Sequence, residues 1–337
     1  MGTNSEKVRW GILGVAAIAV RRVIPAMQRG QRCEIAAIAS RDRTKAEEAA
    51  RNLGIPKAYG SYDELLADPD IDAVYNPLPN HLHVPWSIRA AEAGKHVLCE
   101  KPIGLTADEA RRLLETRDRT GVKIAEAFMV RCHPRWLRVR ELIAAGRIGQ
   151  LRAIHIALGY FNRDPQNVRN IANYGGGALL DLGCYAVTLS RFLFREEPLR
   201  VSGLVERDPQ LGTDRLTSAI VEFPSGRSLF TCSTQLSYFQ SMELHGATGT
   251  MQLDKLINPP TDAPSRIVIY DGPERFNTDP VVEAIPVCNQ FTIQSDLFSK
   301  AVLEDGEVPV PLEDSVRNMA AIDAIFRSAA SGNWETP

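Results

Sequence analysis

The sequence predicts an α/β protein: a doubly wound parallel sheet in the first part, then an α+β domain with a large, open, mostly antiparallel sheet. Over roughly the first 125 residues, short runs rich in Val and Ile alternate with amphipathic helical stretches. Several strand-like segments then follow one another, which favours antiparallel pairing. The 337 residues, 44% of them apolar, can fill two hydrophobic cores. We expect domains over residues 1–128 and 129–337, with the last helix able to pack back on the first domain.

The elements of the first domain follow from these runs. The helix after the fourth strand should begin at Thr106, which forms a capping-box pattern with Glu109, and end at Gly121. Parallel strands are expected at residues 8–14, 34–40, 72–79, 96–102 and 122–128.

The second domain should open with a helix at residues 133–146 and a strand at 151–160. A glycine-rich turn then leads into another helix. A hairpin is expected around Pro224–Arg227, because two alternating runs flank this turn. Further strands are expected within residues 241–254 and 266–272, and a final helix at 315–332.

Composition excludes several classes of partner. Basic residues number 39 and acidic residues 41, a net charge of −2 without a basic block, so nucleic acid is not an expected partner. The polar N-terminus lacks the apolar core of a signal peptide, and no run approaches the roughly 20 apolar residues of a membrane span. The six cysteines form no CxxC pair, and most should be buried apolar residues in a reducing compartment. We therefore expect a cytoplasmic protein with no membrane partner.

The turn after the first strand, "GILGVAAIAV", lies where a dinucleotide's diphosphate would meet the start of a helix. With Gly14 as the first glycine of G-x-G-x-x-G, the other two positions hold Ala16 and Ala19. A methyl group at the second position crowds the diphosphate, so this loop alone is either a nucleotide site or an ordinary tight turn. The predicted cofactor contacts here are Gly14, Ala16, Ala17 and Ile18.

The end of the second strand favours NADP(H), with NAD(H) as the alternative. Ser40 and Arg41 stand where an NAD site usually has Asp or Glu, and a hydroxyl with a guanidinium suits a 2′-phosphate. Asp42 comes one residue late. Lys45 is a further predicted contact, and the alternative is that Arg41 is only a solvated loop residue.

Three residues are candidates for catalysis. Lys101, in "EKP", follows a strand at the edge where open α/β sheets bind ligands, although a salt-bridged structural lysine is the alternative. Asp181 and Tyr185 are four residues apart in "YGGGALLDLGCY", hence on one face of the helix after three glycines. Such glycines let a backbone pass close to a ligand. A phenol beside an ammonium has a lowered pKa, because the positive charge favours the phenolate. Such a pair can take a proton from an alcohol while hydride leaves its carbon.

These residues resemble the glucose-fructose oxidoreductase, inositol dehydrogenase and rhizopine-catabolism (Gfo/Idh/MocA) family. The resemblance is carried by "RWGILGVAAIA", "DIDAVYNPLPNHLHVPWSIRAAEAGKHVLCEKPIGLT", "EAFMVRCHP", "GGGALLDLGCY" and "DSVRNMAAIDAIFRSA". It implies a Rossmann domain followed by an α/β domain whose open sheet packs against a partner subunit. It also implies that Lys101 is the catalytic lysine, that Asp181 lies on the substrate side and that Tyr185 is the acid/base, as in the sugar- and dihydrodiol-oxidising branch.

Further roles follow from the same resemblance. The residues that it places around the nicotinamide are Pro77, Asn80, His81 and Glu100. Arg131 and His133-Pro134 open the second domain, with Arg131 facing substrate. Asn167 and Arg169 either line the substrate pocket or belong to an ordinary polar loop. No metal is expected, because His81 and His83 have no cysteine or carboxylate cluster beside them, and a hydrogen-bonding or capping role suits them better.

The expected function is NADP-dependent hydride transfer between nicotinamide and a sugar or cyclic polyol, as in an aldose 1-dehydrogenase. A trans-dihydrodiol dehydrogenase and a keto-sugar reductase are alternatives of the same family. A non-catalytic NADP-binding sensor is an alternative of another class, but such a protein would be expected to lose Lys101 or Tyr185. The expected assembly is a homodimer or homotetramer formed through the C-terminal sheet.

Overall fold

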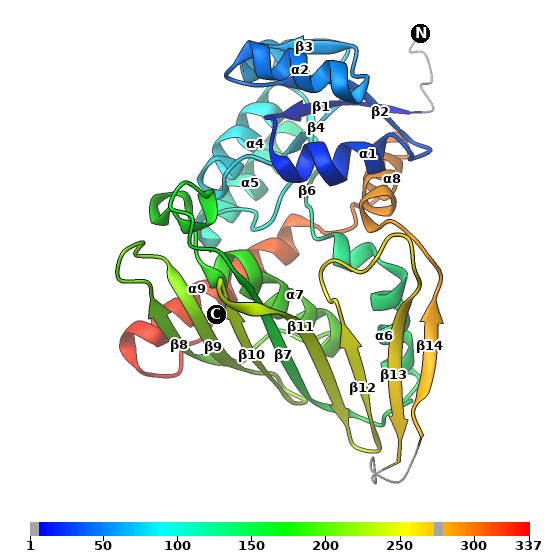
Figure 1. Cartoon of the computed structure of the whole chain (residues 1–337), viewed down its shortest axis with the longest axis vertical. Coiled ribbons are helices and arrows are strands. Elements are labelled where there is room, and N and C mark those ends of the chain that lie inside the picture. Colours follow the sequence, from blue (N-terminus) through cyan, green and yellow to red (C-terminus); the bar gives the residue numbers. More distant parts are fainter. Residues whose placement is uncertain (1–6, 273–278) are drawn as a thin grey trace. The chain divides into compact units, whose positions relative to one another are not determined.

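The computed structural model describes residues 7–272 and 279–337, which form two compact units (Figure 1). The first unit runs to Met129 and includes Asn289–Val316, and the second contains Val130–Cys288 and Arg317–Pro337. The sequence assigned residues 289–316 to the second domain. They belong to the first unit because they cover its sheet: Trp10 Nε1 donates to Ser299 Oγ at 3.2 Å, and the rings of Trp10 and Phe298 lie 5.4 Å apart.

The first unit contains the predicted parallel sheet, with six strands in the order β3-β2-β1-β4-β5-β6. Its strands are β1 Val8–Leu13, β2 Cys33–Ala39, β3 Lys57–Tyr59, β4 Ala73–Asn76, β5 His96–Cys99 and β6 Ile124–Glu126. Its helices are η1 Ala19–Val23, α1 Ile24–Met27, α2 Arg43–Leu53, α3 Tyr62–Leu66, η2 Asn80–Leu82, α4 His83–Glu92, α5 Ala107–Thr120 and α8 Gln290–Leu303. The strand order reverses between β1 and β4, which is where sheets of this kind bind dinucleotides.

Several strands are shorter than predicted. β4 ends at Asn76 because Pro77 has no backbone N–H to donate. β5 likewise ends at Cys99, before Pro102. The polar residues at these strand ends therefore lie in loops at the carboxyl edge of the sheet.

Helix α5 begins and ends as predicted, with one difference in its capping box. Thr106 Oγ1 accepts from Glu109 N at 3.2 Å, and Gly121 ends the helix with φ 72°. Glu109 Oε2 accepts from Leu105 N at 2.8 Å, one residue earlier than the capping box would have it.

The second unit is built on an eight-stranded sheet in the order β14-β13-β12-β11-β7-β10-β9-β8. Among the described strands of this sheet only β7 and β10 pair in parallel. The predicted hairpin is confirmed, with Glu222 of β9 opposite Arg227 of β10, whereas the edge strands β8 and β14 were not predicted. The strands are β7 Leu151–Phe161, β8 Arg200–Arg207, β9 Asp214–Glu222, β10 Arg227–Ser233, β11 Gln235–Gly246, β12 Gly249–Asp254, β13 Ser265–Asp271 and β14 Val281–Ile285.

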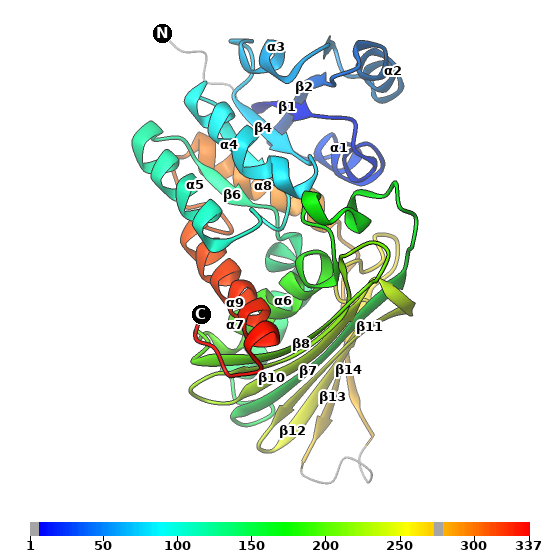
Figure 2. The same ribbon diagram turned by 90° about the vertical axis from the view of Figure 1, so that its left-hand side faces the viewer.

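Helices α6 and α7 cover one face of this sheet, and the described part of the unit leaves the other face open (Figure 2). The remaining elements are η3 Met129–Cys132, α6 Pro134–Ala144, η4 Val168–Asn170, η5 Ala172–Tyr174, η6 Leu179–Gly183, α7 Cys184–Phe194 and α9 Leu312–Ser331.

The centre of the second unit is the apolar segment Ala172–Phe194. Contrary to the sequence analysis, this segment is long and apolar enough to cross a membrane by length and composition. Its most apolar window is entirely buried inside the unit, as in the core helix of a globular protein. Five of the six cysteines are buried and all six are free thiols, as predicted.

Candidate active site

The turn between β1 and the first helix requires glycine at position 14. Gly14 has φ 96°, a conformation that residues with a side chain rarely adopt, and its N–H donates to Ala39 O at 2.8 Å. A Cβ atom on Gly14 would also lie 3.0 Å from Leu78 Cδ2, in the loop after β4. The loops after β1 and β4 therefore approach closely at the point where the strand order reverses.

The helix that follows has the features of an anion site. Ala16 O accepts from Val20 N at 3.0 Å, so the first turn begins at Ala16, and no side chain caps it. Within residues 7–272 and 279–337, no hydrogen bond uses the amides of Ala17 or Ile18. Uncapped amides at a helix start suit the diphosphate of a dinucleotide.

The end of β2 presents a cation. Asp42 is occupied as the N-cap of α2, where its carboxylate accepts from Lys45 N at 3.2 Å. Lys45 Nζ lies 3.8 Å from the same carboxylate and is largely exposed. Arg41 is exposed, and its charge is the cause after burial that lowers the pKa of His81. The guanidinium therefore lies near the loop after β4, where it fits a 2′-phosphate better than a ribose hydroxyl.

Glu100 links the ends of β4 and β5. Its Oε1 accepts from Tyr75 Oη at 2.6 Å, its Oε2 accepts from Lys101 N at 3.3 Å, and its own N–H donates to Asn76 O at 3.0 Å. These bonds fix the backbone on which the half-buried Lys101 stands.

His83 connects the loop after β4 with the loop after β5. Its ring is buried, with Nε2 2.6 Å from Leu78 O and Nδ1 2.7 Å from Pro102 O. Burial lowers the pKa of His83 to about 4, although the two carbonyls favour the charged form. The structure supports a hydrogen-bonding role for this residue rather than a metal-binding one.

Asn76 completes this scaffold and was not singled out from the sequence. It is buried, and its Nδ2 donates to His83 O at 3.0 Å and to Ser87 Oγ at 3.1 Å. Its Oδ1 accepts from Leu78 N at 3.3 Å. An amide side chain at the end of an otherwise apolar strand, just before a proline, was the available signal.

In the second unit, Asp181 is the centre of a polar cluster. Its Oδ2 accepts from Tyr160 Oη at 2.7 Å and its Oδ1 from Arg169 Nε at 3.1 Å, and only 9% of the residue is exposed. Burial, followed by the charge of Asp181, raises the pKa of Tyr160. The pKa of Arg169 is also raised, first by Asp181 and further by Tyr160 and Tyr185.

The glycines before this helix approach the protein's own chain. A Cβ on Gly176 would lie 2.4 Å from Arg169 O, and one on Gly177, which has φ 127°, would lie 1.8 Å from Asp214 Oδ1. For Gly176 and Gly177 the structure thus gives a reason other than room for a ligand. They let the polar loop and Asp214 pack against the helix start.

Asp214 holds that helix start and was also missed. Its Oδ2 accepts from Leu179 N at 2.7 Å and from Thr217 Oγ1 at 3.0 Å. Burial raises the pKa of the Asp214 carboxyl to about 6. The first turn after it, Leu179–Gly183, is a π-helix, and it carries Asp181.

The remaining predicted residues of this unit have visible structural contacts. Arg131 stacks over Phe192, 4.4 Å from the ring centroid. Asn167 caps η4, accepting from Arg169 N at 3.1 Å. His133 caps α6 in the same way, and burial lowers its pKa to about 4. Arg169 is joined directly to Asp181 by the hydrogen bond from its Nε.

Comparison with known proteins agrees with this arrangement. The model of an oxidoreductase family with an NAD-binding Rossmann fold matches residues 8–128, and that of the GFO/IDH/MocA C-terminal domain matches residues 136–252. The chain is 47% identical over 332 residues to an uncharacterized oxidoreductase of Rhizobium meliloti, covering 98% of this chain and 99% of the relative.

Two further matches carry named activities. The chain is 39% identical to D-xylose 1-dehydrogenase (NADP(+)) 2 of Haloferax volcanii, over 96% of this chain and 98% of the relative. A crystal structure of a 3-ketoreductase from Actinomadura kijaniata with NADP and TDP-benzene matches with a TM-score of 0.89 and 28% identity, covering 96% and 98% of the two chains. The protein is thus an enzyme of the GFO/IDH/MocA family of oxidoreductases, and residues 8–128 of its first unit are the family's NAD-binding Rossmann domain.

Proposed function

We propose that the enzyme transfers hydride between NADP(H) and a hydroxyl-bearing carbon of a sugar or cyclic polyol, with oxidation of an aldose at its anomeric carbon as the leading reaction. The observation that carries this proposal is the nearly buried Asp181, which Tyr160 and Arg169 hold by hydrogen bonds on the helical segment that also bears Tyr185. A fixed carboxylate next to a phenol suits a polyhydroxylated substrate, because one hydroxyl is anchored while another reacts. The similarity to a xylose dehydrogenase supports the aldose.

The cofactor contacts proposed in the first unit start from the features described at the ends of β1 and β2. The turn at Gly14 with the amides of Ala17 and Ile18 would hold the diphosphate, and Ser40 with Arg41 the 2′-phosphate. We propose that the nicotinamide is surrounded by Pro77, Asn80, His81 and Glu100. When bound, the nicotinamide supplies or accepts the hydride.

The proton is handled by the protein. We propose that Tyr185 exchanges a proton with the reacting hydroxyl and that Lys101 supports this proton transfer. Asp181 accepts a hydrogen bond from a second hydroxyl, and Arg169 orients the carboxylate.

The second candidate is reduction of a nucleotide-linked keto-sugar, which uses the same chemistry in reverse. The 28% identical 3-ketoreductase, solved with TDP-benzene, favours it. The two functions differ in the size of the group beyond the reacting ring, so a substrate panel separates them.

The test is a panel of aldoses, inositols, a trans-dihydrodiol and dTDP-linked keto-sugars, followed by NADPH absorbance. Lys101→Met should lower kcat by roughly 10²-fold or more, the usual size of an acid/base contribution, with NADPH affinity nearly unchanged. Tyr185→Phe should behave in the same way. Retention of most of the activity by Lys101→Met refutes the assignment, and NADPH binding without turnover on any substrate favours a sensor.

We also propose self-association through the open face of the second sheet, as a homodimer or homotetramer. This face bears exposed apolar side chains, including Leu204 at 76% exposure and Ile220 at 36%. Light scattering after size-exclusion chromatography measures the mass, and a Leu204→Lys variant should shift it towards the monomer.

A further inference from the structure

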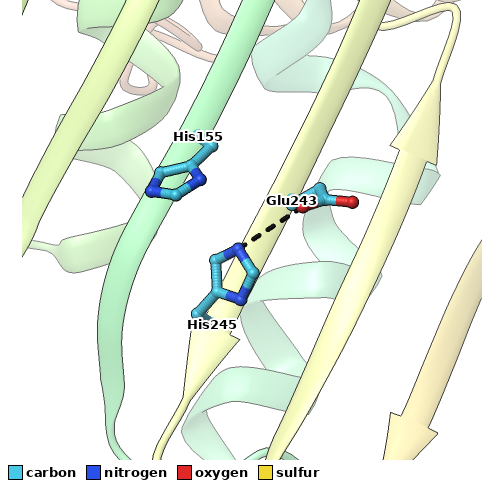
Figure 3. Close-up of side chains that lie close together, drawn as sticks. All are labelled: His155, Glu243 and His245. Carbon is cyan, nitrogen blue, oxygen red and sulfur yellow. Dashed lines mark ion pairs between the residues drawn. The ribbon is translucent and has the colours of Figure 1, made fainter. Parts of the chain in front are cut away.

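Three potential metal ligands lie together on the open face of the second sheet, and none of them is among the residues proposed for hydride or proton transfer. In the β7–β11 ladder His155 lies opposite Glu243, and His245 lies opposite Ala153 (Figure 3). Positions two apart along a strand share a face, so the register brings His155, Glu243 and His245 to one side. The alternate residues, such as Ile154 and Leu244, are buried on the other side.

The separations suit ligands of one ion. One donor atom from each residue lies within 4.8 Å of the others. His245 Nε2 is 3.5 Å from Glu243 Oε2, longer than a close charge-assisted hydrogen bond. Two ligands of a tetrahedral zinc, with bonds of about 2.0–2.1 Å, lie roughly 3.3 Å apart. Small side-chain rotations would therefore bring the three donors around a cation.

A neighbouring side chain orients the carboxylate. Gln252, opposite Glu243 in the β11–β12 ladder, donates from Nε2 to Glu243 Oε1 at 2.5 Å. This bond holds one carboxylate oxygen while the other faces His245. Outer hydrogen bonds of this kind fix ligand geometry in metal sites.

There is also room for a fourth ligand. A hollow of about 560 Å³ on this sheet is lined by His155 and Glu243, together with Ser241 and Thr231. Water from such a hollow would complete a tetrahedral shell, as in zinc sites with three protein ligands.

We propose that His155, Glu243 and His245 bind a divalent transition metal ion, with zinc as the ion that this donor set favours. Two imidazoles and one carboxylate are typical of zinc and of its neighbours in the first transition row, whereas magnesium and calcium prefer oxygen ligands alone.

The test is calorimetric titration of the purified full-length protein, after removal of metals with a chelator, using ZnCl₂ alone and MgCl₂ as the comparison. The protein is titrated in its native assembly, because the ligands lie on the face proposed for self-association. We expect one zinc per chain and no heat from magnesium. His245→Ala and Glu243→Gln should each weaken zinc binding at least tenfold.

Glu206→Gln, on strand β8 of the same sheet, is the matched control, because it removes the same charge from an exposed carboxylate paired with Arg215. It should leave zinc affinity unchanged. Absence of zinc binding to the wild-type protein, or equal affinities for Glu243→Gln and Glu206→Gln, overturns the proposal.

A measurement on the wild-type chain tests the proposed site even if the variants fail to fold. His155 is exposed in the single chain, so at protein concentrations low enough for the assembly to dissociate it should react with diethyl pyrocarbonate, and zinc should protect it at least fivefold, as measured by peptide mass mapping. Equal modification of His155 with and without zinc contradicts its role as a ligand.

Discussion

The stability of the second unit should fall as the pH rises through the range in which Asp214 loses its proton. Burial raises the pKa of this carboxyl from 3.8 to about 6. Because the folded chain binds this proton more tightly, the added stability is complete below the ordinary pKa and is lost as the pH rises through the folded value. The difference, 6 minus 3.8 or about 2.2 pKa units at about 1.36 kcal/mol each, corresponds to roughly 3 kcal/mol.

Asp214→Asn isolates this effect, because the amide oxygen still accepts from Leu179 N but does not titrate. The free energy of unfolding in urea is measured for both proteins from about pH 4 to about pH 7. The variant should gain stability relative to the wild type by up to about 3 kcal/mol across this interval.

Asp208→Asn is the control. The pKa of Asp208 is lowered to about 2, first by the hydrogen bond from Gln235, so its stabilising contribution is lost only as the pH falls below the ordinary value. The stability difference between Asp208→Asn and wild type should thus be almost constant above about pH 4. A constant difference for Asp214→Asn as well would refute the reasoning.

Other substitutions test the remaining contacts. Arg41→Ala should weaken NADPH binding by about tenfold or more and leave NADH binding unchanged, as measured by fluorescence titration. The reason is that a charge-assisted hydrogen bond to the 2′-phosphate contributes about 1.5–3 kcal/mol. Equal losses of affinity for both nucleotides would contradict a 2′-phosphate site. Tyr160→Phe removes the hydroxyl that donates to Asp181 and should lower kcat/KM by roughly 5- to 100-fold at unchanged NADPH affinity. An unaltered kcat/KM would show that Asp181 does not bind the substrate. His83→Leu should lower the free energy of unfolding by about 1–3 kcal/mol, as measured by thermal denaturation. The loss is that of one hydrogen bond, because a neutral ring donates to only one of the two carbonyls that it contacts. An unshifted unfolding transition would rule out the bridge between the two loops.

The first sheet was predictable because most of its strands are apolar runs between helices with clear start and stop residues, such as Thr106 and Gly121. β3 was missed because Lys57–Tyr59 is only three residues long and half-buried, too short to show a period. The placement of α8 was missed for another reason. Apolar spacing shows that a helix has a buried face, but it does not show which sheet that face covers.

The candidate site divides in the same way. Lys101, Asp181 and Tyr185 could be singled out because they belong to local motifs at a strand end and a helix start. Tyr160 and Asp214 could not, because their contacts with the 179–183 turn join residues 21 and 35 positions apart. Such contacts depend on how strands β7 and β9 pack against the helix, and no local pattern encodes that packing.

Because residues 289–316 belong to the first unit, this unit is completed by a segment that is synthesised late. Phe298 and Ser299 complete the surroundings of Trp10, whose side chain is fully buried in the first strand. These contacts of Trp10 can form only after residues 298 and 299 have been synthesised, close to the end of the chain. A fragment cut after Met129 would lack these contacts of Trp10, and we expect it to aggregate more readily than the full chain.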